Sequence, residues 1–360
     1  MDISKIDENF KTTSVTRDDV VWYDAETLPL YGVFYDKERE CFARMPHAVA
    51  KTVSLGVEYL AENTSGGRVR FMTDSPFVAI KCLQTQSDIT HNSSSGMLFA
   101  FSVYQNGEYR GMVSPTAAQR HDLKEGCFFF DGLRPLAEAG EKEVALFFPL
   151  YNKVKKAYIG LKAGCKLLPP KVYTYSKPVV FYGSSITQGG CASHSGNDYI
   201  SVLSRWLDFD YVNLGFSGGA RGEKEMREYL ASLDASVFVL DYDHNAPNVA
   251  HLQNTHYPLY EGIRKAHPQT PILFLSKPDM DFDPEASEER KRVIRATYLQ
   301  AKKEGDENVF FIDGKKLFGK EDRTACTVDG CHPNDLGFYR MAKTVKPVLE
   351  KILKKLAVRS

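Results

Sequence analysis

The chain has 360 residues, of which 43% are hydrophobic and 12% aromatic, enough for two domain-sized cores. Its 46 basic and 46 acidic residues cancel, which argues against the broad positive surface that nucleic acids or anionic membranes attract. No apolar run in the sequence approaches the ~18 residues of a membrane-spanning helix. We therefore expect a globular protein with neither a nucleic-acid nor a membrane partner.

The N-terminal segment, residues 1–8, lacks the apolar core of a secretion signal. The seven cysteines are widely scattered, and an odd number without paired spacing indicates neither a disulfide framework nor a metal site. Both observations predict a reduced, cytoplasmic setting, unless a leader has been removed from the sequence.

The first 170 residues have the pattern of an all-β domain. Runs of β-branched and aromatic residues between turn residues are found at 68–72, 77–83, 97–105, 108–113, 127–130 and 143–148. Asn106-Gly107 separates two of these runs, and it favours a tight hairpin because both turn positions need a positive φ. Since no convincing helix lies among them, the runs predict a jelly-roll-like β-sandwich over residues 1–170.

After Pro169-Pro170, the expected linker, the pattern changes to alternating strands and helices. The expected strands are 179–182, 211–214, 237–240, 272–275 and 309–312. The expected helices are 199–207, 223–233, 257–266, 288–303 and 336–356. Such alternation predicts parallel strands joined by right-handed crossovers, with helices on both faces. We therefore predict a three-layer α/β/α domain over residues 171–360.

The first strand of this domain runs into Gly183-Ser184-Ser185, and a helical segment is expected after the glycine pair at 189–190. A serine at the carboxyl end of a buried strand lies where open α/β sheets bind their ligands. Ser185 is the candidate nucleophile, with Ser184 competing by position, and a serine hydroxyl needs a base to take its proton. The simpler alternative is a serine that only caps the following helix.

Near the end of the chain, Asp329 precedes His332 by three residues, and Gly330 eases the turn between them. Such a carboxylate can hold one ring nitrogen of a histidine and leave the other nitrogen free for a serine hydroxyl. Histidine as a residue type titrates near neutrality, which suits a base. The alternative is a surface turn followed by a histidine that only caps the last helix.

Two segments at strand ends could stabilise an oxyanion. Residues 213–220 leave the second strand in a glycine-rich turn, where backbone N–H groups can approach a substrate. The alternative is a tight turn whose glycines only provide the positive φ that it needs. After the third strand, the ionised Asp241 and Asp243 cannot donate, so Asn245 is the better donor, with simple turn formation as its alternative. His244 and His256 could line a pocket or be ordinary surface and helix-end residues.

In this order the pieces resemble the blocks of the SGNH hydrolases, also called GDSL esterases. Residues 183–189 are similar to the first block of that family, 216–218 to the second and 329–333 to the last. The resemblance covers residues 177–356 and is strongest to bacterial members with an N-terminal β-sandwich. Ser184 stands where the first block usually has an aspartate, and 241–245 departs from the usual Gly-x-Asn-Asp of the third block.

The resemblance implies a serine esterase that needs no cofactor and no metal. In it, Ser185 attacks, His332 carries the proton and Asp329 orients His332, while the N–H groups of Ser185 and Gly218 and the amide of Asn245 hold the oxyanion. The implied substrate is a small-molecule or oligosaccharide ester of a small acyl group, acetyl above all.

Two alternatives to this esterase stay open. One is an acyltransferase that forms the same acyl-enzyme, and the other is a carbohydrate-binding protein whose second domain is degenerate. Tyr151-Asn152 is an expected contact between the domains. The sequence leaves the oligomeric state open.

Overall fold

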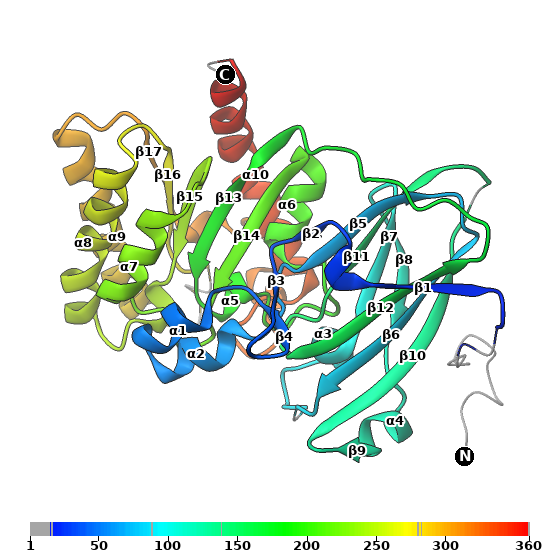
Figure 1. Cartoon of the computed structure of the whole chain (residues 1–360). Coiled ribbons are helices and arrows are strands. Elements are labelled where there is room, and N and C mark those ends of the chain that lie inside the picture. The colour runs from blue at the N-terminus through cyan, green and yellow to red at the C-terminus, as the bar shows by residue number, and fades with distance from the viewer. Residues whose placement is uncertain are drawn as a thin grey trace.

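The computed structural model describes residue 15 and residues 17–87, 89–137, 139–278, 281 and 283–358. The segment 1–8, on which the prediction of location partly depends, lies outside these described residues. Figure 1 shows a β-rich N-terminal part beside a C-terminal part in which helices flank a sheet. No helix in the described ranges has the length and apolar character needed to cross a membrane.

The N-terminal part is a sandwich of two five-stranded antiparallel sheets, as predicted. The first sheet has the order β1 (Val20–Asp24), β12 (Val154–Lys162), β6 (Phe77–Thr85), β10 (Cys127–Pro135) and β9 (Leu123–Lys124). The second has the order β2 (Leu30–Tyr31), β5 (Arg68–Thr73), β11 (Lys142–Phe147), β7 (Phe101–Gln105) and β8 (Glu108–Val113). A small hairpin joins β3 (Phe34–Asp36) and β4 (Cys41–Ala43). Asn106 and Gly107 have φ values of 50° and 82°, which confirms the predicted hairpin turn.

The prediction that this part lacks helices is wrong. It contains α1 (His47–Val53), α2 (Leu55–Ala61), α3 (Ser95–Phe99) and α4 (Ala117–His121), besides the short 3-10 helix η3 (Ala25–Thr27). The run 97–105, predicted as one strand, is divided between α3 and β7. Ser94 starts α3 by accepting a hydrogen bond from the N–H of Met97, and Met97, Leu98 and Phe99 are all buried. A short, wholly buried apolar run has no periodicity that separates helix from strand.

The C-terminal part contains the predicted parallel sheet, with strands in all five expected places. The strand order is β14 (Phe209–Gly215), β13 (Tyr175–Gly183), β15 (Val237–Asp241), β16 (Ile272–Leu275) and β17 (Val309–Ile312), all parallel. The chain passes from β13 to β14 on one side and then returns to β15 on the other. The carboxyl ends of β13 and β15 therefore form the topological switch point at which open α/β sheets bind ligands.

Helices cover both faces of this sheet, which confirms the three-layer prediction. The helices α6 (Tyr199–Leu207) and α10 (Asp335–Ala357) pack on one face, and α7 (Lys224–Ser232), α8 (Val249–Ala266) and α9 (Pro284–Lys303) on the other (Figure 1). Successive side chains of β13 alternate between these layers: Val179 and Phe181 join the core of α6 and α10, while Val180 and Tyr182 join that of α7 to α9.

Several helix boundaries differ from the prediction. The helical segment expected after the glycine pair 189–190 is α6, but a short helix that was not predicted, α5 (Ser185–Gln188), precedes the pair and ends at Gly189, which has a φ of 95°. α8 begins at Val249 instead of residue 257, because the side chain of Asn248 caps it and Pro258 is accommodated inside it. α9 begins at Pro284 instead of residue 288, with Asp283 as its cap.

The two parts are in close contact. One hydrophobic cluster contains Phe148 and Leu150 of the N-terminal part together with Tyr199 of α6. On the opposite face of the sheet, α1 packs against α7. The connection between β12 and β13 spans residues 163–174, and the boundary at 170 stays a prediction.

Candidate active site

Ser185 is the first residue of α5, directly beyond the carboxyl end of β13. The Oγ of Ser184 accepts a hydrogen bond from the N–H of Ile186 at 3.2 Å, so Ser184 takes the capping role considered for Ser185. A Cβ on Gly183 would lie 2.1 Å from Oγ1 of Thr187, which restricts this tight strand-to-helix turn to glycine. The turn thus leaves the hydroxyl of Ser185 available to another partner.

That partner is His332. Its Nε2 lies 2.9 Å from Oγ of Ser185, and its Nδ1 lies 2.8 Å from Oδ2 of Asp329. The serine, the imidazole and the carboxylate thus form one continuous hydrogen-bonded line, although 147 positions separate Ser185 from His332. All three side chains of the predicted nucleophile, base and orienting acid are brought together.

Asp329 is held in its ionised form by a set of donors. Burial alone would raise the pKa of its carboxyl, but hydrogen bonds from the His332 N–H, the Asn92 amide, the His332 ring and the Cys331 N–H hold that pKa well below its usual range. A charged carboxylate at this position can stabilise the imidazolium that forms when His332 takes a proton.

Cys191 lies beside this pair. One ligand atom each of Cys191, Asp329 and His332 lie within 4.8 Å of one another, a spacing that a metal ion could also use. Burial, followed by the charge of Asp329, raises the pKa of the Cys191 thiol to about 12, so the thiolate that binds metals is disfavoured at neutral pH. Because Asp329 and His332 already bond to each other, this group fits a proton relay better than a metal centre.

The backbone N–H groups of Ser185 and of Gly218 have no hydrogen-bond acceptor among the described residues. Gly218 is exposed and has a φ of 66°. The N–H of the preceding Ser217 donates to Oε1 of Gln188 at 2.9 Å, and the amide of Asn213 donates to the Thr187 carbonyl at 2.7 Å. These two bonds tie the glycine turn to α5, and sequence reasoning assigned no role to either Gln188 or Asn213.

Asn245 lies in the 3-10 helix η4 (Asp243–Asn245) after β15. Its Nδ2 donates to the carbonyl of Phe216 at 2.8 Å, two residues before Gly218. An amide nitrogen carries two hydrogens, so this bond leaves one for another acceptor.

The chain was compared with known families and structures. The description "GDSL-like Lipase/Acylhydrolase family" matches residues 176–350, and "N-terminus of Esterase_SGNH_hydro-type" matches residues 20–167. A putative GDSL-like lipase from Bacteroides ovatus is similar over 93% of this chain and 98% of its own, with 28% identity and a TM-score of 0.82. The chain belongs to the SGNH hydrolases.

More distant structures share the fold of this SGNH hydrolase. A salicylyl-acyltransferase from a tetracycline biosynthetic pathway is 21% identical, with a TM-score of 0.73 over 95% of this chain and 97% of its own. A family two carbohydrate esterase from Clostridium thermocellum, in complex with cellohexaose, is 16% identical, with a TM-score of 0.60 over 81% of this chain and 94% of its own. No curated protein matched the chain.

A cavity of about 500 Å³ opens beside His332 of this SGNH hydrolase. The α/β part contributes Gly190, Cys191, Ser217 and His332 to its wall. The N-terminal part contributes the rest, including two tyrosines and many side chains with hydroxyl or amide groups: Tyr59, Tyr151, Asn63, Gln86, Ser87, Thr90, Asn92 and Ser93. The sandwich part therefore forms most of the cavity wall next to His332.

The expected contact at Tyr151-Asn152 is present for one residue. The hydroxyl of Tyr151 donates to the carbonyl of Ser185 at 3.1 Å. Asn152 instead bonds to Gln84 and Thr85 within the sandwich.

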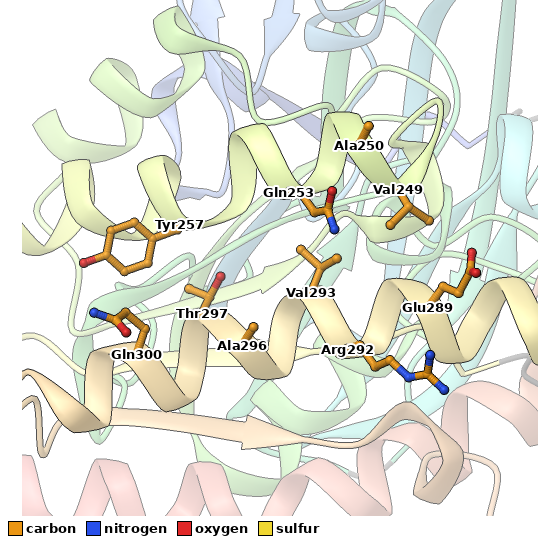
Figure 2. A pocket seen from close by; sticks show the side chains of 10 residues that line it. All are labelled: Val249, Ala250, Gln253, Tyr257, Glu289, Arg292, Val293, Ala296, Thr297 and Gln300. Carbon is orange, nitrogen blue, oxygen red and sulfur yellow. The ribbon is translucent and has the colours of Figure 1, made fainter.

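A larger cavity of about 730 Å³ lies in a groove between α8 and α9, and Figure 2 shows its lining side chains on these two helices. None of them belongs to the site around Ser185. His256 is buried close to this groove, where Nδ1 lies 2.8 Å from Oγ1 of Thr297, and burial lowers the pKa of its ring to about 3. His256 is thus a core residue, whereas Nδ1 of His244 lies 3.8 Å from the sulfur of Cys331, next to the site.

Proposed function

We propose that this SGNH hydrolase is a serine esterase acting through Ser185, His332 and Asp329. His332 Nε2 takes the proton of the Ser185 hydroxyl as Oγ attacks the ester carbonyl, and His332 then gives that proton to the departing alcohol. Water attacks the resulting acyl-enzyme by the same route and regenerates the serine. The observation that carries this proposal is the hydrogen-bonded line from Ser185 through His332 to Asp329.

The oxyanion formed in both steps needs hydrogen-bond donors, and we assign this role to the N–H groups of Ser185 and Gly218 and to Nδ2 of Asn245. The two N–H groups have no acceptor within the described chain, so they are available to a substrate oxygen. The assignment of Asn245 is supported by its bond to Phe216, which holds the amide beside the Gly218 turn. No metal or organic cofactor enters either step.

We further propose that the substrate is a small acyl ester, acetyl above all, of a carbohydrate. The cavity beside His332 is rich in hydroxyl and amide groups, which suit a polyol better than a lipid chain. The backbone of Gly190 packs closely on the site, since a Cβ there would lie 2.9 Å from the Tyr151 hydroxyl and 3.1 Å from the Ser185 carbonyl oxygen. The fold is shared with carbohydrate esterases, including an acetyl xylan esterase from Butyrivibrio proteoclasticus.

The first test is hydrolysis of p-nitrophenyl acetate together with labelling by a fluorophosphonate probe. Ser185→Ala should abolish both, whereas Ser184→Ala, which loses only a helix cap, should still be labelled. Labelling of Ser185→Ala at the wild-type rate would refute Ser185 as the nucleophile. Acetylated oligosaccharides assayed with the wild-type enzyme then identify the alcohol part of the substrate.

The same acyl-enzyme could transfer its acyl group to an alcohol, and the acyltransferase of similar fold keeps this alternative open. Product analysis with and without an acceptor alcohol separates hydrolysis from transfer. A carbohydrate-binding protein with a degenerate second domain would bind glycans and leave the probe unreacted.

We also propose a reducing, cytoplasmic location, because all seven cysteines are free thiols and Cys41, Cys82, Cys127 and Cys326 are buried. Fractionation of the source cells tests this location.

A further inference from the structure

The connection between β6 and α3 reaches from the sandwich part into the active site. Nδ2 of Asn92, in this connection, donates to Oδ2 of Asp329 at 2.9 Å. The same oxygen accepts the hydrogen bond from Nδ1 of His332. A residue of the N-terminal part is thus bonded to the carboxylate that orients the proposed base.

The direction of the Asn92 amide is fixed by its own turn. Oγ1 of Thr90 donates to Oδ1 of Asn92 at 2.9 Å, so the amide oxygen points to Thr90 and the nitrogen to Asp329. Ser93 closes the turn, because its Oγ accepts a hydrogen bond from the N–H of Thr90 at 2.8 Å.

The turn is anchored to the α/β part as well. Oγ of Ser94 donates to the carbonyl of Ser193 at 2.8 Å, and the N–H of Cys191 points to the sulfur of Met97 at 3.1 Å. A Cβ on Gly96 would lie 2.4 Å from the Ser193 carbonyl oxygen, which shows how closely the two segments approach. Asn92 is therefore held in place by hydrogen bonds within its own turn and by the contacts of the following residues with the α/β part.

Asn92 completes the set of donors around Asp329. Oδ1 accepts from the N–H groups of Cys331 and His332, and Oδ2 accepts from His332 Nδ1 and from Asn92. A carboxylate accepts about four hydrogen bonds, so these donors use its capacity and oppose rotation of the group.

We propose that Asn92 is a positioning residue, through which the sandwich part fixes Asp329 and so aligns His332 for proton transfer from Ser185. This inference rests on the proposed esterase function. Other titratable groups lie near the pair among the described residues: Cys191 from the segment after α5, Cys331 from the same turn as Asp329, and Tyr151, which lines the cavity with His332. His244 contacts Cys331. The variants below leave all of these unchanged.

The test compares Asn92→Ala and Asn92→Asp with the wild type, using the full chain. Asn92→Ala removes one hydrogen bond to a charged acceptor, so kcat for p-nitrophenyl acetate should fall about 10-fold at unchanged KM. Asn92→Asp places a second carboxylate beside Asp329, which favours the imidazolium, so the acidic limb of the kcat/KM profile should move up by about one pH unit. His91→Ala, an exposed side chain in the same turn, is the matched control and should match the wild type in both.

Titration of the His332 ring by NMR gives a readout that needs no turnover. Asn92→Asp should raise the ring pKa relative to the wild type, and His91→Ala should not. An unmoved ring pKa together with an unchanged kcat in Asn92→Ala would overturn the positioning role while leaving the esterase proposal intact. Wild-type protein that hydrolyses no ester would refute the esterase proposal, and the NMR comparison would still decide whether Asn92 acts on the pair.

Discussion

Nη1 of Arg44 in the N-terminal part donates to the carbonyl of Gly215 at the end of β14, at 2.8 Å. The same guanidinium donates to the carbonyls of Asn213, Asn63 and Leu60, so it joins α2, the sandwich and the turn that leads to Gly218. Arg44 is only 3% exposed, and burial lowers its pKa to about 9, which still leaves it charged at neutral pH. It has no carboxylate partner among the residues described and is neutralised by carbonyl dipoles instead.

Arg44→Ala should destabilise the protein strongly, because it removes the buried charged group that donates to these four carbonyls. We expect a loss of about 3 kcal/mol or more in the free energy of unfolding, measured with urea. Arg39→Ala is the control and should cost less than about 1 kcal/mol, because the Arg39 side chain is 42% exposed and its partner Glu62 keeps its pair with Lys153. Equal losses of free energy of unfolding in the two variants would show that the buried Arg44 contacts stabilise the protein no more than the Arg39 pair does.

Asn245→Ala tests the third proposed oxyanion donor. Loss of one such donor typically lowers kcat by ~10²–10³ with little change in KM. Loss of the bond to Phe216 also removes a support of the Gly218 turn, so thermal unfolding should be recorded in parallel. If stability decreases while kcat stays at the wild-type level, Asn245 holds the loop and does not contact the oxyanion.

Tyr59→Ala tests the sugar side of the cavity. Tyr59 on α2 is 69% exposed and lines the cavity, so its ring is available to pack on a sugar ring. Removal of the ring should raise KM for an acetylated oligosaccharide about 5-fold, corresponding to ~1 kcal/mol, and leave p-nitrophenyl acetate unaffected. Leu55→Ala is the matched control, because Leu55 is 84% exposed on the same helix and lies outside the cavity wall. An unchanged KM for every acetylated oligosaccharide would exclude Tyr59 from substrate binding.

Asp241 makes stability depend on pH. It is buried at the end of β15, where Oδ2 accepts from Thr187 and Tyr199 and Oδ1 has no hydrogen-bond partner within the described part of the chain. Burial, and then the charge of Asp243, raises the pKa of its carboxyl to about 7. An unfolded aspartate loses its proton near pH ~4, so the folded state binds the extra proton between these values. Asp241 therefore stabilises the fold at the acidic end of this window, and that contribution is lost as pH rises to 7.

Asp241→Asn should remove this dependence. The free energy of unfolding of the variant, relative to that of the wild type, should be higher at pH 8 than at pH 5 by on the order of 2 kcal/mol. Urea unfolding of both proteins at the two pH values measures this difference. Asp234 is an exposed carboxylate just before β15, so Asp234→Asn should keep the pH dependence of the wild-type free energy of unfolding. Parallel pH dependence in Asp241→Asn and the wild type would contradict the assignment.

The sequence predicted the α/β part well because its signals are local and repeated. Five apolar runs became the five parallel strands, and Tyr199–Leu207 became α6 with both bounds correct. The N-terminal part was harder, since α1 and α2 are short and bury only one side against the α/β part. Their helical state depends on that packing more than on intrinsic propensity.

Ser185, His332 and Asp329 could be named from the sequence because each lies in a short segment with a chemical signature, and the roles assigned to them stay predictions. Asn92, Tyr59 and Gln188 carry no such signature. Asn92 lies 237 positions from Asp329, and only folding reveals that it donates to that carboxylate.

The amino-acid order by itself determined the layered architecture, because hydrophobic spacing, turn dipeptides and helix caps act over a few residues. Only the tertiary structure decided which groups surround the serine, because contacts between distant segments supply the free energy for that arrangement. Such contacts bury Arg44, pack α3 against residue 193 and form the cavity wall.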